Sequence, residues 1–294
     1  MGQYQLRNNR MTIAVKSAGA ELSSVQMDGK EYLWNADPAF WTRSSPVLFP
    51  FVGGLKNKQF IYAGNFYPMG QHGFARDMDF ELVEQTTQSL KFALQSNEET
   101  LQKYPFDFLL TIEYILQDNH LEVLWNVKNT GKKELLFSIG GHPGFMCPIN
   151  GEGTQTDYQI RFFKSGKPLS KFESMAIGED GLINGKVNHF ELADGLLPVT
   201  EHLFDGDALV LENYQADEIA LVNPQGKAYL TVRFTTPLVG VWSPVKKNAP
   251  FICIEPWCGR CDRTDFSGEL SQREYGNKLN PGDAFENGFE IVAE

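Results

Sequence analysis

The sequence has few cysteines and no long apolar run, and both shortages narrow the class of protein. Four cysteines occur among 294 residues, and no apolar run approaches the roughly 20 residues that a membrane-spanning helix needs. The N-terminal segment MGQYQLRNNRM lacks the apolar core of a signal peptide. We therefore expect a cytoplasmic protein without membrane attachment, whose cysteines are thiols rather than disulfides.

Motifs for nucleotides and metals are scarce as well. There is neither a GxxxxGK phosphate loop nor a GxGxxG fingerprint, so we expect no nucleotide cofactor. Cys258 and Cys261 form a CxxC pair, but a structural zinc site needs four ligands, and no second CxxC or HxxxH pair is present. A redox CxxC needs a βαβ setting, which the sequence does not offer. We therefore expect no metal and no cofactor, and we interpret the CxxC spacing as chance.

Cationic residues are outnumbered by acidic ones. The 26 Lys and Arg against 37 Asp and Glu give a net charge of −11. The cations form no basic stripe, so nucleic acid is not an expected partner. Hydrophobic residues make up 42% of the chain, which suits a globular core and is too high for a disordered protein.

Long helical patterns are also rare, whereas short alternating runs recur along the chain. Alternation and β-forming residues predict strands at 11–16, 59–67, 90–95, 108–116, 121–127, 134–139, 158–163, 207–211, 227–234, 238–242, 251–255 and 285–292. One short helix is predicted over 97–104, with Asn97 as its N-cap and Pro105 as its stop. Many short strands without a linker or repeat indicate a single all-β domain over 1–294, a sandwich or a barrel.

Three segments place polar side chains among Gly, Pro and aromatic residues: 71–76 (QHGFAR), 140–145 (GGHPGF) and 254–259 (IEPWCG). In the second, His142 follows an apolar run and a glycine pair, and Pro143 keeps it out of helical geometry. An imidazole has an unperturbed pKa of about 6.5, which suits proton transfer near neutrality. The alternative is a histidine that only holds its loop by hydrogen bonds.

Glu255 ends the apolar run 251–254. A carboxylate in that position is costly unless it is paired, solvated or used in chemistry. Partly buried carboxylates have raised pKa values, which is the property that a general base needs. The alternative is a structural ion pair with Arg260 or Arg263.

His72 and Arg76 lie in one loop, where an imidazole and a cation can together bind hydroxyls or an anion. The alternative is a loop stabilised by a bridge from Arg76 to Asp77 or Asp79.

Two further carboxylates, Asp205 and Asp207, precede the run ALVLEN. Both suit a turn, and Asp207 is the better ligand candidate because it lies nearer the strand. His120, His189 and His202 have no ligand-like neighbours, so we expect them in surface loops.

Taken together and in this order, HGFAR, GGHPGF and EPWCG resemble the aldose 1-epimerase (galactose mutarotase-like) family, and in particular its LacX-like branch. The resemblance extends over nearly the whole chain, including the ending NPGDAFENGFEI. It implies a β-supersandwich with a cleft on one sheet and with no metal or cofactor. The implied activity is interconversion of the α and β anomers of an aldose, so the implied partner is a small sugar.

The resemblance also implies roles for individual residues. Glu255 matches the general base that removes the proton from the sugar O1 hydroxyl, and His142 matches the general acid that protonates the ring oxygen O5. His72 matches a second histidine near the ring oxygen, while Arg76 and Asp207 match residues that contact the sugar. The chemistry agrees, because mutarotation needs one acid and one base and no nucleophile, redox centre or metal.

Two departures from the family pattern leave the substrate open. Where galactose mutarotases have an Asn-Arg pair, this chain has Asn57 and Lys58, and Asn57 remains a candidate substrate-binding residue. The HGFAR form also resembles hexose-6-phosphate mutarotases, in which case Arg43, Lys56, Lys58 and Arg76 would supply an anion site. The alternatives are therefore a sugar-phosphate mutarotase, a carbohydrate-binding protein without catalysis and, more remotely, a metal-dependent sugar isomerase.

Overall fold

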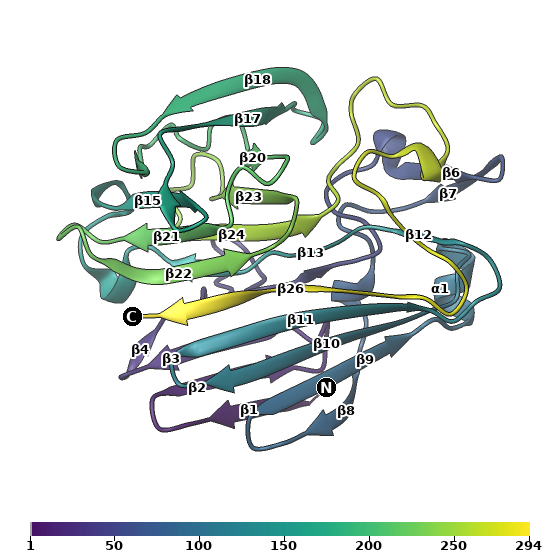
Figure 1. Ribbon diagram of the computed structural model, residues 1–294, viewed down its shortest axis with the longest axis horizontal. Helices are drawn as coiled ribbons and strands as arrows, with labels where there is room; N and C mark the ends of the chain where they lie inside the picture. Colours follow the sequence, from purple (N-terminus) through teal and green to yellow (C-terminus); the bar gives the residue numbers. More distant parts are fainter. Residues whose placement is uncertain (1) are drawn as a thin grey trace.

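The computed structural model describes residues 2–294 and consists mainly of antiparallel strands (Figure 1). The larger sheet contains β8 (Glu81–Gln85), β9 (Ser89–Gln95), β10 (Phe108–Gln117), β11 (His120–Asn129), β15 (Gln159–Lys164), β16 (Lys167–Pro168), β19 (Leu196–Pro198), β21 (Glu218–Val222), β22 (Ala228–Phe234) and β26 (Ala284–Ala293). Its order is β16-β15-β21-β22-β26-β11-β10-β9-β8, and β19 pairs with β15. The C-terminal strand therefore lies in the middle of this ten-stranded sheet.

The second sheet has eight strands and carries the sequence motifs 140–145 and 254–259. Its members are β5 (Val47–Leu48), β13 (Ile139–Gly141), β14 (Gly144–Met146), β17 (Lys171–Ile177), β18 (Ile183–Glu191), β20 (Leu209–Leu211), β23 (Leu238–Trp242) and β24 (Phe251–Cys258). They follow the order β18-β17-β20-β23-β24-β13-β5, and β14 pairs with β24. Segments far apart in the sequence therefore meet around β24.

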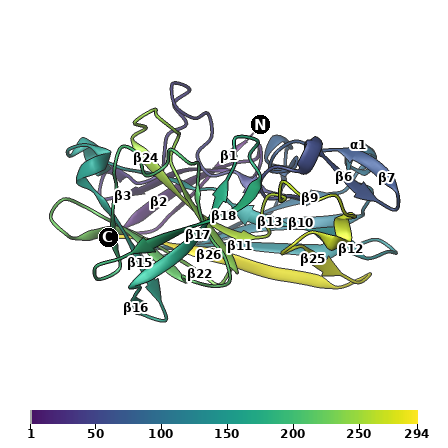
Figure 2. The ribbon, with the colours of Figure 1, turned by 90° about the horizontal axis from the view of Figure 1, so that it is seen from above.

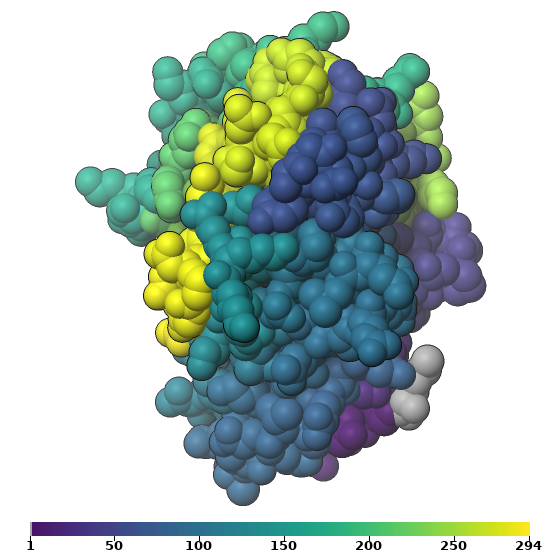
Figure 3. Space-filling model, turned by 90° about the vertical axis from the view of Figure 1, so that its right-hand side faces the viewer, coloured from purple at the N-terminus to yellow at the C-terminus, as the bar shows by residue number. Residues whose placement is uncertain are grey.

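Three smaller sheets complete the fold. They are formed by β1 (Gln3–Arg7), β2 (Met11–Lys16), β3 (Leu22–Met27) and β4 (Lys30–Glu31), by β6 (Gln59–Tyr62) and β7 (Asn65–Pro68), and by β12 (Leu135–Phe137) and β25 (Asn277–Leu279). Figures 1 and 2 show the pairs β6–β7 and β12–β25 at the same end of the molecule as the helix α1 (Glu98–Lys103). Viewed from that end, the blue segment around 55–75 lies beside the yellow-green segment around 260–275 (Figure 3).

Helical structure is limited to short elements. The predicted helix is confirmed as α1: the side chain of Asn97 accepts a hydrogen bond from the Thr100 N–H, and the Thr100 hydroxyl accepts one from the Asn97 N–H, which caps the helix at its start. The remaining helical elements are single 3₁₀ turns, η1 (Lys56–Lys58), η2 (Ala75–Asp77), η3 (Ile149–Gly151), η4 (Gln155–Asp157) and η5 (Leu270–Gln272). Among the described residues, no helix has the length and apolar character needed to cross a bilayer.

The predicted all-β fold is confirmed. Its clearest case is the pair of strands predicted at 108–116 and 121–127, whose short connection indicates a hairpin. Strands β10 and β11 pair in register from Phe108 opposite Asn129 to Gln117 opposite His120. Buried and less buried side chains alternate along both strands, as the sequence pattern requires of a sheet with one face on the core.

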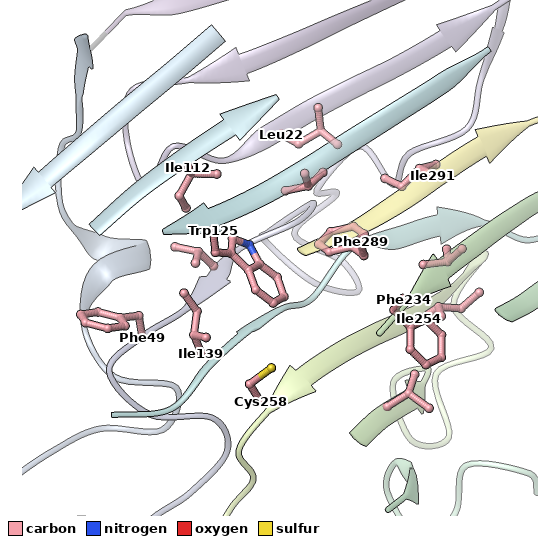
Figure 4. Close-up of a cluster of buried hydrophobic side chains, with 14 of the residues drawn as sticks. Leu22, Phe49, Ile112, Trp125, Ile139, Phe234, Ile254, Cys258, Phe289 and Ile291 are labelled. Atoms are coloured by element: carbon pink, nitrogen blue, oxygen red, sulfur yellow. The ribbon is translucent and has the colours of Figure 1, made fainter. Parts of the chain in front are cut away.

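The core lies between the two large sheets. Ile254 and Cys258 of β24 belong to the main hydrophobic cluster together with Trp125 of β11 and Phe289 of β26 (Figure 4). Because successive side chains in a strand point to opposite faces, the even-numbered residues of β24 bury the core face of the sheet. The odd-numbered residues of β24 face the other side of the sheet, and the candidate functional site lies on that side.

Two strand predictions need correction. The run 59–67 is a hairpin rather than one strand, because Ala63 and Gly64 adopt positive φ angles of 50° and 74° that reverse the chain. The run 134–139 is divided at Ser138 between β12 and β13, which pair in different sheets. Several strands have no predicted counterpart, among them β1, β3, β8, β17, β18 and β21. Strand β18, for example, is an edge strand with almost every side chain exposed, so it has no hydrophobic alternation.

Candidate active site

A cavity of about 320 Å³ lies on the face of the eight-stranded sheet that carries the odd-numbered side chains of β24. Five of the six candidate residues line it: His72, Arg76, His142, Asp207 and Glu255. They come from loops and strands that the sheet order brings together around β24. The structure therefore assembles most of the site that the sequence predicts.

Glu255 lies within β24, opposite Gly240 of β23, and is 1% exposed. The structural alternative for this carboxylate, an ion pair with Arg260 or Arg263, is wrong. Arg260 pairs instead with Glu212 and with Glu274, and Arg263 pairs with Asp265.

His142 occupies the short connection between β13 and β14, where its backbone N–H donates to the Pro46 carbonyl at 3.1 Å. Its Nε2 lies 3.2 Å from Oε2 of Glu255, so the two groups expected to transfer protons face each other directly. The indole of Trp41 lies over the imidazole, with ring centroids 4.7 Å apart and a tilt of 32°. Trp242 lies against a second side of the imidazole in a T-shaped arrangement, with ring centroids 5.5 Å apart.

Burial favours the uncharged form of both groups. It lowers the pKa of His142 to about 3. It raises the pKa of Glu255 well above its usual value, and the negative charge of Asp207 raises it further. Of the groups around Glu255, the indole of Trp257 is the one that lowers its pKa. Opposite shifts of this kind are typical of acid–base sites.

The backbone fixes the tautomer of His72. The Gly53 N–H donates to His72 Nδ1 at 3.0 Å, so the proton of the neutral ring is on Nε2. Burial, and then the neighbouring His142, hold the pKa of His72 well below its usual value. Gly73 makes this loop possible, since its φ is 70° and a Cβ there would lie 2.3 Å from the Phe49 carbonyl oxygen. His72 is therefore a neutral N–H donor.

One nitrogen of the Arg76 guanidinium has no hydrogen-bond partner. Its Nη2 donates to the Gln71 carbonyl at 2.9 Å, while its buried Nε has no hydrogen-bond partner. The bridge from Arg76 to Asp77, which was the alternative to a binding role, is long at 3.9 Å, because Asp77 pairs with Arg43. Arg76 thus lines the cavity with a buried Nε–H that has no hydrogen-bond acceptor.

The structure distinguishes between the two neighbouring carboxylates. Asp205 pairs with His202 at 2.9 Å, whereas Asp207 lines the cavity. The left-handed backbone of Asp207, with a φ of 73°, lets its Oδ1 accept from the Ala208 N–H at 2.7 Å. Asp207 is the carboxylate that can reach a ligand there.

Asn57 is not brought to the cavity. It lies exposed in η1 with a φ of 56° and is not among the cavity-lining residues. The four-cation anion site is not assembled either. Lys56 bonds the Thr264 carbonyl, Lys58 is exposed, and Arg43 is paired, so Arg76 alone of the four lines the cavity.

Sequence reasoning missed the aromatic walls formed by Trp41, Trp242 and Trp257. Trp257 could have been found, because strand alternation places it on the same face as Glu255. Trp41 could not, since it belongs to a loop with no pattern.

One group of side chains in the described part of the chain can offer three metal-ligand atoms. Ligand atoms of His142, Cys253 and Glu255 lie within 4.8 Å of one another. Cys253 also packs in an aromatic cluster with Trp34 and Phe251. All four cysteines are free and buried, which confirms the prediction of thiols.

Comparison with known proteins indicates the family of the chain. A family model described as aldose 1-epimerase matches residues 2–290. The plasmid-encoded protein LacX of Lactococcus lactis subsp. lactis is 30% identical over 301 residues, and the match covers 98% of each chain.

Two solved structures are similar throughout. A galactose mutarotase related enzyme from Lactobacillus acidophilus shares 34% identity with a TM-score of 0.93, over 100% of this chain and 97% of that one. A galactose mutarotase-like protein from Lactobacillus casei shares 30% identity with a TM-score of 0.91, over all of both chains. The chain therefore belongs to the aldose 1-epimerase family of sugar isomerases.

Proposed function

We propose that the protein is a mutarotase that interconverts the α and β anomers of a free aldose, with Glu255 as the base and His142 as the acid. The observation that carries the proposal is the 3.2 Å contact between Glu255 Oε2 and His142 Nε2 in the cavity. O1 and the ring oxygen O5 of a sugar are both bonded to C1, so the groups that exchange protons with them must be neighbours. These two side chains satisfy that requirement.

The pair needs a single proton to work. When both groups are neutral, that proton is on the Glu255 carboxyl. Its transfer across the contact to His142 produces a carboxylate and an imidazolium, which are the base and the acid. Glu255 then removes the O1 proton while His142 protonates O5, the C1–O5 bond breaks, and C1–O1 becomes the aldehyde carbonyl.

The reverse steps close the ring on the other face. After rotation about C1–C2, O5 attacks the carbonyl carbon, His142 takes the O5 proton, and Glu255 returns a proton to O1. Protons balance within the pair and no electrons are gained or lost, so this chemistry requires no metal or cofactor.

The surrounding residues have matching roles. The Nε2–H of His72 donates to the ring oxygen as charge develops on it, the kind of electrostatic assistance that fixed donors provide. Asp207 accepts hydrogen bonds from sugar hydroxyls, and the free Nε–H of Arg76 donates to them. The pattern fits a neutral polyol with several hydroxyls.

A sugar phosphate is less well supported than a free aldose. A phosphate dianion needs compensating cations, but Arg76 is the one proposed cation that lines the cavity, alongside the carboxyl groups of Asp207 and Glu255. We therefore favour an unphosphorylated substrate.

Polarimetry tests the proposal. Freshly dissolved α-galactose or α-glucose should reach anomeric equilibrium faster with the protein than without it, and the corresponding 6-phosphates should respond less. Sugar binding without faster equilibration would indicate a non-catalytic carbohydrate-binding protein. No effect on any of these sugars or their phosphates would rule the activity out.

A further inference from the structure

Trp257 lies in a seat built from two glycines. It follows Glu255 by two positions in β24, so both side chains leave the same face of the strand. A Cβ on Gly140 of β13 would lie 2.6 Å from Cδ1 of the indole, and a Cβ on Gly240 of β23 would lie 2.4 Å from its Cη2. The indole therefore extends across β24 from one neighbouring strand to the other.

The contact with the indole, rather than an unusual backbone conformation, explains why glycine occupies these two positions. Neither Gly140 nor Gly240 has a positive φ, so both positions have a conformation that any residue adopts. A methyl group at either position would collide with the Trp257 ring. The two strands thus hold the ring flat over the sheet at the edge of the cavity, where it is 6% exposed.

The seat holds the indole N–H on the face of β24 that also carries the Glu255 carboxyl, and both residues line the cavity. Nε1 of Trp257 and Oε2 of Glu255 are both buried without a hydrogen-bond partner, although His142 Nε2 lies 3.2 Å from Oε2. Unpaired buried polar atoms are rare in native proteins and call for a reason. Burial and the charge of Asp207 both disfavour the charged form of Glu255, whereas the indole of Trp257 favours it.

We propose that Trp257 is the positioning residue of the base, whose indole N–H hydrogen-bonds to the Glu255 carboxylate when that group is deprotonated. The proposal rests on the proposed function, because it assigns Trp257 a role through Glu255. In the catalytic cycle the carboxylate forms when its proton passes to His142. A donor already held by the glycine seat then stabilises the anion without reorganisation and leaves the other carboxylate oxygen for O1.

Two other roles for Trp257 give different results. A ring that only fills space would support folding, and its loss would lower the rate by the same factor at every pH. A ring that only stacks on the sugar would lower sugar affinity. A donor to Glu255 shifts the pKa of that residue and leaves sugar affinity unchanged.

The test removes the N–H and measures the protonation of Glu255. Trp257→Phe keeps an aromatic ring, and replacement of Trp257 by benzothienylalanine keeps the full bicyclic shape with sulfur in place of N–H. Trp125→Phe is the matched control, since Trp125 is a buried tryptophan of the other sheet that does not line the cavity. Glutamate labelled with ¹³C at the carboxyl carbon, assigned with Glu255→Gln, reports the Glu255 titration by NMR.

We expect both Trp257 replacements to raise the Glu255 pKa by about 1–2 units, the shift expected for loss of a hydrogen bond to a charged group. The acid limb of the mutarotation pH profile should move upward by the same amount, so that the rate loss is greatest at low pH. Galactose affinity by calorimetry should stay within about twofold, and Trp125→Phe should leave the Glu255 titration unchanged.

An unchanged Glu255 titration in the benzothienylalanine protein would overturn the proposal, as would an equal rate loss at every pH. The NMR measurement needs no turnover. If the wild-type protein fails to accelerate mutarotation, the proposed function fails, while the titration still decides whether Trp257 acts on Glu255.

Discussion

Replacing Glu255 by Gln removes the proposed base while keeping the shape of the side chain. General acid–base groups contribute about 10²- to 10⁴-fold to rate, which corresponds to about 2.7–5.4 kcal/mol of barrier. We expect a loss toward the upper end of this range, because Glu255 is 1% exposed and faces His142 directly, so that water cannot readily replace it. Galactose affinity should change little, since the other cavity-lining residues remain.

The same substitution has a predictable effect on stability. Burial raises the pKa of Glu255 well above its value in the unfolded chain, so the folded state disfavours the carboxylate. As pH rises from the unfolded-state pKa through the folded-state pKa, wild-type stability falls. Gln carries no charge, so Glu255→Gln should unfold at a temperature no lower than wild type at pH 8.

Polarimetry with freshly dissolved α-galactose gives the catalysed rate, and thermal denaturation at pH 8 gives the stability of the same samples. A folded Glu255→Gln protein with wild-type turnover would refute the assignment of Glu255 as the base. A variant that melts far below wild type would refute the stability argument, because it would show that the carboxylate supports the fold.

Three further predictions concern neighbouring groups. Burial lowers the pKa of His142 from 6.5 to about 3, so wild-type stability should fall as pH drops through this window. In urea titrations His142→Gln should lose less stability than wild type by pH 5, with a difference of about 2 kcal/mol. Parallel stability profiles of the two proteins against pH would contradict this. Asp207→Asn should raise KM for galactose at least several-fold, whereas the matched change Asp205→Asn should not, and equal effects would disprove a distinct role for Asp207. Arg273 pairs with Asp262 at 2.6 Å in the interior. Arg273→Met should lower the free energy of unfolding by about 3–5 kcal/mol, because it leaves a buried carboxylate unpaired. A loss below about 1 kcal/mol would show that water reaches Asp262.

The sequence determined the local elements where one physical signal dominates. Alternation over 108–127 predicts the hairpin of β10 and β11, and Asn97 predicts the start of α1. Motif identity and order were enough to indicate the family, and with it Glu255 and His142. Judged from its own segment, neither residue could be separated from a structural role.

Tertiary structure decided which of these residues meet. Alternation predicts which side chains share a face of β24, but it cannot predict that β13 and β23 flank that strand, because sheet order does not follow chain order. Loop paths decide the choice of Asp207 over Asp205, the exclusion of Asn57 from the cavity and the tilted contact of Trp41 with His142.

The glycine seat shows the same limit. Gly140 and Gly240 are distant in sequence, and neither marks a turn, so nothing local connects them with Trp257. Both glycines leave room for the Trp257 indole, which each of them contacts from one side. The sequence by itself therefore determined the kind of fold and identified the residues that we propose to transfer protons. Only the folded sheet determined their neighbours, because non-local pairing sets the distances on which hydrogen bonding and pKa values depend.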